Sequence, residues 1–370
     1  MQNRVFINYF DTVCCAGNNP KELFEAILEK RDCIFLDTTF VKEQIVAIGK
    51  IKKDICLNEL LVQRLKKLLE NTNLEDFSQT LLVVGSSVGG MNETERVYFK
   101  DKNYKNIDYK KHPIDSIVHF LKQKFNFYDD ISFSTACTSS ANALGYAKEC
   151  INKGIYKNVL VVGIDVLSFT TVCGFRALSV LSSKPCTPFD KNREGMNVAE
   201  GFGILLLQDK EYENSIEFLG VGYSSDAHHM TQPHPEGFGA IEAMKNALKN
   251  ANIKSNEIDY INAHGTGTYA NDFSELTAIK TLFENKVKVS STKSITGHTL
   301  GAAGAIEAII CCMVLKKQII PTNKGLVDIE IEGINYSFEN EKQNIKYTIS
   351  NSFAFGGNNT SLILGICNEY

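Results

Sequence analysis

The sequence predicts an α/β protein in which sheets are covered by helices on both faces. Strand-like runs rich in branched and aromatic residues alternate with amphipathic, helix-like runs along the chain. Two segments also resemble each other, because each leads from a strand-like run through a reactive side chain into a helix rich in small residues. The alternation is typical of layered α/β folds, and the internal similarity favours two related halves.

Ten strands are expected where short apolar runs are bounded by turn-forming residues. They cover Val5–Tyr9, Thr80–Gly85, Ile131–Thr135, Val159–Ile164, Gly203–Leu207, Glu217–Tyr223, Tyr260–Ala263, Lys286–Ser290, Tyr347–Ser350 and Thr360–Gly365. Seven helices are expected between them, where apolar residues recur three and four positions apart. They cover Glu22–Lys30, Leu57–Leu69, Asp115–Lys122, Ala141–Asn152, Gly239–Asn250, Asp272–Leu282 and Ala302–Lys316.

The two similar segments define the expected halves. The first, ISFSTACTSSANALGYAKECINKG, places Cys137 ahead of its helix, and the second, KVKVSSTKSITGHTLGAAGAIEAIICCMVLKK, places His298 in the corresponding position. A charged stretch, QDKEYEN, lies between them. We therefore expect an N-terminal half over residues 1–210 and a C-terminal half over residues 211–370. Two unrelated α/β units would show the same similarity, and the segments alone do not decide between these readings.

Composition excludes several classes of protein. The 370 residues carry a formal net charge of -4, which argues against a nucleic-acid-binding protein, although local basic patches remain compatible with it. No apolar run approaches the roughly 20 residues of a membrane span, and the N-terminus lacks a signal-peptide pattern. The 11 cysteines include no CxxC pair, and their odd number favours free thiols. We expect a cytoplasmic protein.

Cys137 differs from the other cysteines in its surroundings. It lies where a strand-like run meets the first turn of a helix, and the small residues Ala136, Thr138, Ser139 and Ser140 leave room for a substrate. The unpaired N–H groups and positive end of a helix stabilise a thiolate. The setting favours a reactive cysteine, although a cysteine that is simply packed at the start of a helix has the same local sequence.

Two histidines occupy comparable settings. His264 follows a short apolar strand in NAHGTGT, where Gly265 and Gly267 permit a tight backbone and close approach of a ligand. His298 lies at the start of the second helix, five residues after Lys293. A helix N-terminus disfavours a cation, so a neutral imidazole that donates one N–H is expected there. Neither segment has the spacing of a metal site such as HExxH, and no metal is expected.

Six blocks of sequence carry a resemblance to a known family. In chain order they are TACTSSANALG, CTPFDKNREGMNVAEGFG, SSDAHHMTQPHPEG, NAHGTGTYANDFSE, STKSITGHTLGAAGAIEA and NSFAFGGNN. They resemble the signature blocks of elongating β-ketoacyl-acyl carrier protein (ACP) synthases of types I and II. The resemblance extends from about Leu81 to Leu364 and is specific, because all six blocks keep their order and spacing. It implies the thiolase fold, in which two similar halves stack as five layers, α-β-α-β-α.

The resemblance also implies roles for individual residues. Cys137 is similar to the acylated nucleophile of the family, and His264 and His298 resemble the two histidines of its Cys-His-His set. Lys293 resembles the lysine that supports the second histidine. Phe355 resembles the gating phenylalanine whose backbone N–H shares the oxyanion hole with that of Cys137. The other implied site residues are supporting carboxylates (Asp272, Glu275 and Glu307) and threonines that touch the pantetheine arm (Thr231, Thr266 and Thr268).

The implied reaction is a decarboxylative condensation that uses no cofactor. Cys137 takes an acyl group from acyl-ACP, a malonyl thioester loses CO2, and the carbanion attacks the acyl-enzyme to give β-ketoacyl-ACP. Loss of CO2 builds negative charge on the thioester oxygen, and two neutral imidazoles suit that charge as N–H donors. Lys293 would keep His298 uncharged by like-charge repulsion.

The expected partner is an acidic acyl carrier protein that docks on local basic residues. Arg176, in CGFRALS, matches a contact position of the family, and Lys50, Lys52 and Lys53 form a second candidate patch. A solvated surface explains these lysines equally well. The resemblance also implies a dimer, either a homodimer or a heterodimer with a related subunit. No nucleic acid and no membrane span are expected.

The chain departs from the family pattern in three places. INYFDTVCCAGNN replaces a glycine-rich strand end, and the segment between Gly90 and Asp130 is shorter than in the family, which leaves the preferred acyl length open. Ala354 and Asn358 stand where glycine and threonine are common. Alanine reaches positive φ only at a cost, so a stiffer loop is expected. The departures favour a specialised polyene or polyketide-like pathway, for example an aryl polyene pathway, over housekeeping fatty-acid synthesis.

Three related functions fit the sequence less well. A degradative thiolase requires a second catalytic cysteine near the C-terminus, and SFAFGGNN has none. An initiating synthase carries asparagine in place of the second histidine, whereas STKSITGH supplies His298. A non-catalytic, chain-length-setting subunit generally lacks the nucleophile, whereas Cys137 is present together with His264 and Lys293. This last function is the alternative to the enzyme.

Overall fold

The computed structural model describes residues 3–38, 40–41, 45–51, 56–72, 74, 79–283 and 285–367. Its strands are β1 (Phe6–Cys14), β2 (Phe35–Asp37), β3 (Val46–Ile48), β4 (Leu81–Gly85), β5 (Asp129–Phe133), β6 (Asn158–Asp165), β7 (Gly201–Gln208), β8 (Ile216–Ser225), β9 (Tyr260–Asn262), β10 (Lys288–Ser290), β11 (Ile319–Ile320), β12 (Asn335–Tyr336), β13 (Glu341–Lys342), β14 (Tyr347–Phe353) and β15 (Asn358–Ile366). Its α-helices are α1 (Pro20–Leu28), α2 (Leu57–Glu70), α3 (Met91–Asp101), α4 (Ser116–Phe125), α5 (Ser139–Asn152), α6 (Phe169–Ala177), α7 (Phe238–Ala251), α8 (Tyr269–Phe283), α9 (Lys293–Thr296) and α10 (Ala303–Lys317). Short 3-10 helices lie at Tyr109–Lys111, Ser255–Glu257 and Leu300–Ala302.

Among the described residues, eleven strands form one continuous sheet in the order β12-β10-β9-β14-β15-β8-β1-β7-β6-β4-β5. Five of these strands come from the first half of the chain: β1, β7, β6, β4 and β5. The other six come from the second half: β12, β10, β9, β14, β15 and β8. The two groups join where β1 pairs with β8, through Phe6–Glu217 and Ile7–Ile216 only. The sheet therefore consists of two groups of strands connected by a short junction.

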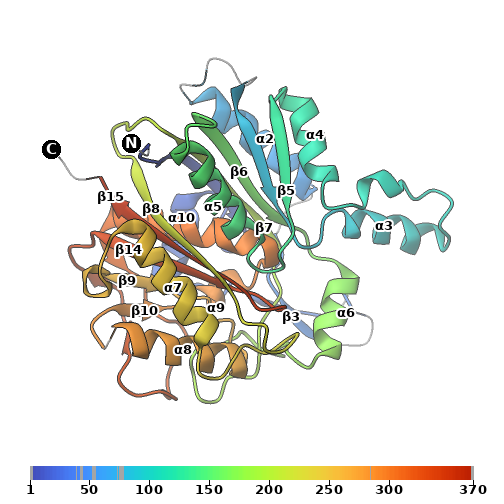
Figure 1. Cartoon of the computed structure of the whole chain (residues 1–370). Helices are drawn as coiled ribbons and strands as arrows, with labels where there is room; N and C mark the ends of the chain where they lie inside the picture. Colours follow the sequence, from blue (N-terminus) through green and yellow to red (C-terminus); the bar gives the residue numbers. More distant parts are fainter. Residues whose placement is uncertain are drawn as a thin grey trace.

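Two helices, α5 and α10, lie between the two groups of strands (Figure 1). α5 contacts β4 and β6 as well as β15, and α10 contacts β6 and β7 as well as β14 and β15. α2 and α4 cover the outer face of the first group, while α7, with α8 beside it, covers the second. The result is the five-layered α-β-α-β-α arrangement of the thiolase fold, as the sequence predicts.

The buried strands divide their side chains between two hydrophobic cores. In β4, Leu81 and Val83 face the central core with α5 and α10, while Leu82 and Val84 face the outer core with α2. α10 is buried on all sides over residues 303–315, because strands or helices surround it. Strands covered on both faces consist of nearly continuous apolar residues, which explains why the sequence indicates them so clearly.

Small residues let α5 and α10 approach each other closely. A Cβ on Gly304 of α10 would lie 2.6 Å from the backbone nitrogen of Ala141 on α5 and 2.8 Å from the Cβ of Ala141. The small residues that follow Cys137 and His298 in the sequence therefore serve this crossing. Because the helices cross here, the reactive residues at their starts are brought together.

All ten predicted strands and all seven predicted helices are present, with boundaries that differ by at most five residues. The prediction misses β2, β3, α3, α6, α9, β11, β12 and β13. α3 has no buried residue and α6 buries only Val172, so neither shows the apolar spacing of an amphipathic helix. Among the described residues, no helix is both long enough and apolar enough to cross a membrane.

The predicted site residues follow the carboxyl ends of parallel strands. β4 runs parallel to β5 and β6 in the first half, and β9 runs parallel to β10 and β14 in the second. Cys137 follows β5, His264 follows β9, Lys293 and His298 follow β10, and Phe355 follows β14. The fold thus gathers residues that are more than 200 positions apart, such as Cys137 and Phe355, at one site.

Candidate active site

Cys137 lies in a tight turn between β5 and α5. The residue before it, Ala136, has a φ of 54°, in the left-handed region that alanine adopts only at a cost. The carbonyl of Ala136 accepts hydrogen bonds from the backbone N–H of Ser139 at 3.1 Å and from Ser87 Oγ at 2.8 Å. Cys137 itself is 8% exposed and lines a cavity. The strained turn therefore presents a nearly buried sulfur to the second half of the chain.

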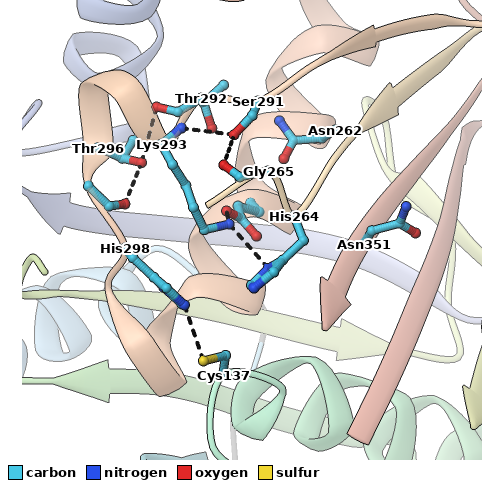
Figure 2. Close-up of polar contacts among 12 residues, drawn as sticks. Cys137, Asn262, His264, Gly265, Ser291, Thr292, Lys293, Thr296, His298 and Asn351 are labelled. Carbon is cyan, nitrogen blue, oxygen red and sulfur yellow. Dashed lines mark hydrogen bonds and ion pairs between the residues drawn. The ribbon is translucent and has the colours of Figure 1, made fainter. Parts of the chain in front are cut away.

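His298 places one ring nitrogen against this sulfur (Figure 2). Its Nε2 lies 3.1 Å from Cys137 Sγ, and its Nδ1 accepts a hydrogen bond from the backbone N–H of Leu300 at 3.2 Å. A neutral imidazole carries one proton, and Nδ1 is the acceptor here, so the proton resides on Nε2. His298 therefore presents an N–H donor to Cys137.

His264 lies beside His298, with the ring centroids 5.2 Å apart and the ring planes at 85°. Lys293 Nζ is 3.3 Å from His264 Nδ1 and also pairs with the buried carboxylate of Glu307. An ammonium group can only donate, so His264 Nδ1 accepts and its proton resides on Nε2. The two imidazoles thus have the same tautomer, each fixed by a donor behind the ring.

Lys293 acts on both rings, but its position differs from the one that the resemblance implies. We expected it to support His298, whereas its ammonium group contacts His264 (Figure 2). Burial lowers the pKa of both histidines well below the usual value, and the charge of Lys293 lowers both further. Both imidazoles are therefore neutral at physiological pH. The neutral form expected for His298 results from burial and from the charge of Lys293, not from the helix start.

The expectation of a stabilised thiolate at Cys137 is wrong for the protein without substrate. Burial raises the pKa of Cys137 to about 12, because the charged sulfur would lose its hydration; the charge of Lys293 and the backbone N–H groups of Phe355 and Cys137 lower this pKa, but by less. The start of the helix does not outweigh the cost of burial. The thiol is protonated at neutral pH, and its proton has to leave as the sulfur reacts.

The raised pKa predicts how Cys137 responds to pH. Only the thiolate is alkylated, so the rate of carboxamidomethylation by iodoacetamide should rise about tenfold per pH unit from pH 7 to pH 9. Peptide mapping at timed intervals would follow Cys137 separately from the other cysteines. A rate that levels off below pH 8 would show that the helix start and Lys293 overcome the effect of burial.

Two buried carboxylates hold the turn that carries His264. Glu275 accepts the backbone N–H groups of His264 and Gly265 at 2.8 Å each, and burial raises its pKa to about 7. Asp272 accepts the N–H of Gly267 at 3.2 Å. Gly265 and Gly267 have φ values of 35° and 84°, which favour glycine at both positions. Of the three acids named from the resemblance, Asp272 and Glu275 therefore position the backbone of this turn, whereas Glu307 pairs with Lys293.

The cavity beside Cys137 contains the predicted binding residues. Its lining includes Thr231, Thr266, Thr268 and Phe355, as the resemblance implies. It also includes Phe175, whose ring centroid lies 6.1 Å from that of Phe355. The sequence reasoning missed Phe175, although its place next to the predicted docking residue in CGFRALS was a signal that could have found it.

The loop after β14 does not place Ala354 under the strain that we expected. Positive φ values fall on Gly356 and Gly357, at 84° and 80°, and Ala354 does not have one. The N–H of Ala354 donates to the carbonyl of Asn358 at 2.8 Å, and the N–H of Gly357 donates to the carbonyl of Ala354 at 3.1 Å. The expectation that alanine stiffens this loop by resisting positive φ is therefore wrong for this conformation.

The predicted docking residues are only partly described. Arg176 is exposed on α6, the helix whose Phe175 lines the cavity. Lys50 is exposed after β3, while Lys52 and Lys53 lie outside the described residues. The structure thus places Arg176 near the mouth of the site and leaves the lysine patch a prediction.

Cys137, His264 and His298 could also be considered as metal ligands, because one ligand atom of each lies within 4.8 Å of the others. In the tautomer described above, His298 Nε2 carries a proton and cannot ligate a metal. The ammonium group of Lys293 contacts His264, and its charge disfavours a second cation beside it. The geometry favours a nucleophile with two N–H donors over a metal centre.

Comparison with known proteins agrees with this chemistry. The chain matches the β-ketoacyl synthase N-terminal domain over residues 56–212 and the β-ketoacyl synthase C-terminal domain over residues 216–326. A 3-oxoacyl-[acyl-carrier-protein] synthase 2 from Coxiella burnetii is 30% identical over 410 aligned positions, covering 98% of each chain. The chain belongs to the β-ketoacyl synthase family. It therefore lies within the thiolase superfamily, and the 3-oxoacyl-[acyl-carrier-protein] synthases to which it is similar are condensing enzymes of the acyltransferase type.

Other relatives extend this family assignment. A 3-oxoacyl-[acyl-carrier-protein] synthase 2 from Vibrio cholerae is 34% identical over 79% of this chain and 77% of that protein, and one from Vibrio harveyi is 38% identical over 63% and 61%. Among solved structures, a chain from the complex of the ketosynthase ApeO with its chain length factor ApeC from Xenorhabdus doucetiae is 30% identical with a TM-score of 0.91, covering 99% and 98% of the two chains. A β-ketoacyl synthase from Burkholderia phymatum is 26% identical with a TM-score of 0.89, covering 99% and 100%.

Proposed function

We propose that this β-ketoacyl synthase transfers an acyl group from acyl-ACP to Cys137 and condenses it with malonyl-ACP to give β-ketoacyl-ACP and CO2. The observation that carries the proposal is the pairing of Cys137 Sγ with His298 Nε2 at 3.1 Å, next to a second imidazole, His264, of the same tautomer. The proposal includes the division of the chain into halves over residues 1–210 and 211–370, with the nucleophile in the first and both histidines in the second.

The acyl-transfer half of the reaction uses the buried thiol. Cys137 Sγ attacks the thioester carbon, and the backbone N–H groups of Phe355 and Cys137, which already lower the thiol pKa, are available to the tetrahedral oxyanion. The carbon–sulfur bond to the carrier then breaks. The departing carrier thiolate takes up the proton that the Cys137 thiol loses, so the exchange needs no net change in protonation. The Nε2–H of His298 stabilises the sulfur while it is charged.

The decarboxylation half uses the two imidazoles as donors. Breaking the bond between the malonyl carboxylate and its α-carbon releases CO2 and moves the electron pair toward the thioester oxygen. The Nε2–H groups of His264 and His298 can donate to that oxygen, and neutral donors favour the charge of the transition state over that of the starting carboxylate. The enolate carbon then attacks the acyl-Cys137 carbonyl, and Cys137 leaves as thiolate. Lys293 and Glu307 stay behind His264 and keep its tautomer.

The binding route supports a carrier-borne substrate. A second cavity of about 560 Å³ adjoins the first and shares Thr231, Thr268 and Phe355 with it. The hydroxyl groups of Thr231 and Thr268 suit the amide groups of a pantetheine arm, and Phe355 lines both cavities. We propose that the arm enters through the second cavity and delivers its thioester to Cys137.

The test of this function is the formation of product. The purified chain, incubated with acyl-ACP and malonyl-ACP, should yield an ACP species heavier than acyl-ACP by one two-carbon unit with a keto group, as measured by intact-protein mass spectrometry. A panel of primers from short to long would also show the acyl length that the chain accepts. Absence of product with every primer, in the presence of a correctly folded protein, would refute the proposal.

The alternative is a non-catalytic subunit that sets chain length. One solved structure that this chain resembles is a ketosynthase in complex with its chain length factor, so a subunit of this second kind is the alternative to weigh. We favour the enzyme because Cys137, His264, His298 and Lys293 form a connected set here. We also propose a dimer, either a homodimer or a heterodimer with a related subunit. A chain that becomes acylated, either alone or together with a related subunit, is an enzyme, and one that becomes acylated in neither state is the alternative.

The carrier protein should approach the mouth of the site at Arg176. An acidic carrier is attracted by this exposed guanidinium group, so Arg176→Glu should raise the KM for acyl-ACP and weaken its dependence on salt, while kcat changes little. Arg31, an exposed arginine after α1, supplies a matched control as Arg31→Glu. Steady-state rates at several salt concentrations would separate the two variants. An unchanged KM in Arg176→Glu would remove this residue from the docking surface.

A further inference from the structure

Asp165 is a buried carboxylate at the end of β6, next to the reactive turns. It is 1% exposed. Its Oδ1 accepts hydrogen bonds from Ser86 Oγ at 2.6 Å and Val88 N at 2.9 Å, and its Oδ2 accepts one from Gly301 N at 2.6 Å. The N–H of Ser87 is shared by both oxygens, at 3.0 Å from each. Within the described part of the chain no ion pair to Asp165 occurs, so these donors alone offset its loss of hydration. Burying a carboxylate without a counter-ion is energetically unfavourable. We therefore expect Asp165 to have a function.

One of these donors, Ser87, also contacts the turn that carries Cys137. Ser87 uses its backbone N–H to bind Asp165 and its Oγ to donate to the carbonyl of Ala136 at 2.8 Å. Ala136 has the left-handed conformation and immediately precedes the nucleophile. A strained residue persists only where its surroundings over-determine its conformation. Ser87, held by Asp165, supplies part of that constraint.

Asp165 also binds the turn that follows His298, through Oδ2. Gly301, which binds Asp165, follows Leu300, and Leu300 has a left-handed φ of 53°. The N–H of Leu300 is the donor that makes His298 Nδ1 an acceptor. A Cβ on Gly301 would lie 2.6 Å from the backbone nitrogen of Ser87, so the two turns touch directly and glycine is needed between them.

We propose that Asp165 is a positioning residue that holds the turns of Cys137 and His298 in register and fixes the tautomer of His298. The carboxylate binds both turns at once. Both oxygens accept the N–H of Ser87, which supports Ala136, and Oδ2 also accepts the N–H of Gly301, in the segment that supports His298. One turn comes from each half of the chain. The expected effect of Asp165 on the reaction rate rests on the proposed function. Its expected effect on the tautomer of His298 does not.

Asp165→Asn is the sharpest test, because it keeps the shape and removes one acceptor. The amide NH2 would face a backbone N–H, at Gly301 or at Val88, and one turn would have to move. A displacement of about 1 Å between reacting groups can lower a rate on the order of 100-fold. We therefore expect decarboxylation of malonyl-ACP to fall about 100-fold, with little change in the KM for malonyl-ACP.

The matched control is Asp259→Asn. Asp259 also accepts two backbone N–H groups, those of Lys346 and Tyr347, but at the amino ends of β9 and β14, away from the site. The second readout is the 15N spectrum of the histidine side chains, in which the His298 signal is assigned from its absence in His298→Gln. Wild type and Asp259→Asn should show the Nε2–H tautomer at His298, and Asp165→Asn should show a mixture.

If Asp165→Asn does not fold, Ser87→Ala provides a second test of the proposal. It removes only the bond to Ala136, so it should slow acylation of Cys137 and leave the His298 tautomer unchanged. Wild-type rates and a wild-type tautomer in a folded Asp165→Asn protein, or wild-type acylation in Ser87→Ala, would overturn the proposal. If the wild-type chain forms no product, the proposed function fails, but the tautomer comparison still tests Asp165.

Discussion

Replacing His298 by alanine should slow the decarboxylation of malonyl-ACP about 100- to 1000-fold, the usual cost of removing one preorganised donor to an oxyanion. His298 Nε2–H lies 3.1 Å from Cys137 Sγ and is fixed as a donor by the N–H of Leu300. Acyl transfer should be less affected, because the backbone N–H groups of Phe355 and Cys137 remain. Release of 13CO2 from labelled malonyl-ACP, together with the mass of the acyl-enzyme, measures the two steps separately.

Two variants control this experiment. His298→Gln restores an N–H donor on a side chain of similar reach, so it should recover part of the decarboxylation that His298→Ala loses. His119→Ala changes a histidine whose side chain is 58% exposed and that pairs with Asp130, away from the cavity, and it should behave as wild type. Decarboxylation near the wild-type rate in His298→Ala, or equal loss in the glutamine variant, would contradict the assignment of His298 as the donor.

Replacing Lys293 by methionine should damage both stability and activity. Lys293 and Glu307 are an ion pair with 0% and 3% of their side chains exposed. Removing the cation leaves a buried carboxylate alone, which typically costs about 3–5 kcal/mol of unfolding free energy. His264 also loses the donor that fixes its tautomer. Decarboxylation should therefore fall along with the midpoint of urea unfolding.

The pair Lys293→Met/Glu307→Gln separates the two effects. The neutral amide needs no counter-ion, so the double variant should regain most of the stability while decarboxylation stays low. Burial raises the pKa of Glu307, and Lys293 opposes that shift. Without Lys293 the carboxyl group is protonated at low pH, so the stability deficit of the single variant should be smaller at pH 5 than at pH 8. Recovery of decarboxylation in the double variant would show that Lys293 acts only through stability.

The order of the elements and the composition of the site could be predicted because each depends on local sequence. β4, β6 and β7 are continuous apolar runs, covered on both faces. Cys137, His264 and His298 each follow a strand and precede small residues or glycine. By contrast α6 buries only Val172, so no apolar spacing indicates it, and Phe175 on this helix was missed as part of the cavity.

The relations between the site residues could not be predicted, because they depend on how distant turns meet. The spacing of Lys293 to His298 is five residues, yet the lysine contacts His264 from another segment. The pKa of Cys137 depends on burial that the local helix start does not reveal. Likewise, Ala354 avoids the positive φ that its neighbours adopt, which only the conformation of the whole loop decides.

The acylation of Cys137 is tested most directly by mass spectrometry of peptides after brief incubation of the chain with acyl-ACP. We expect one acyl group per chain, carried by the peptide that contains Cys137, and none in Cys137→Ala. Added malonyl-ACP should remove this acyl group as β-ketoacyl-ACP forms. An acyl group on another of the 11 cysteines, a distribution over several of them, or no acyl group on the folded chain would contradict the assignment of Cys137 as the nucleophile.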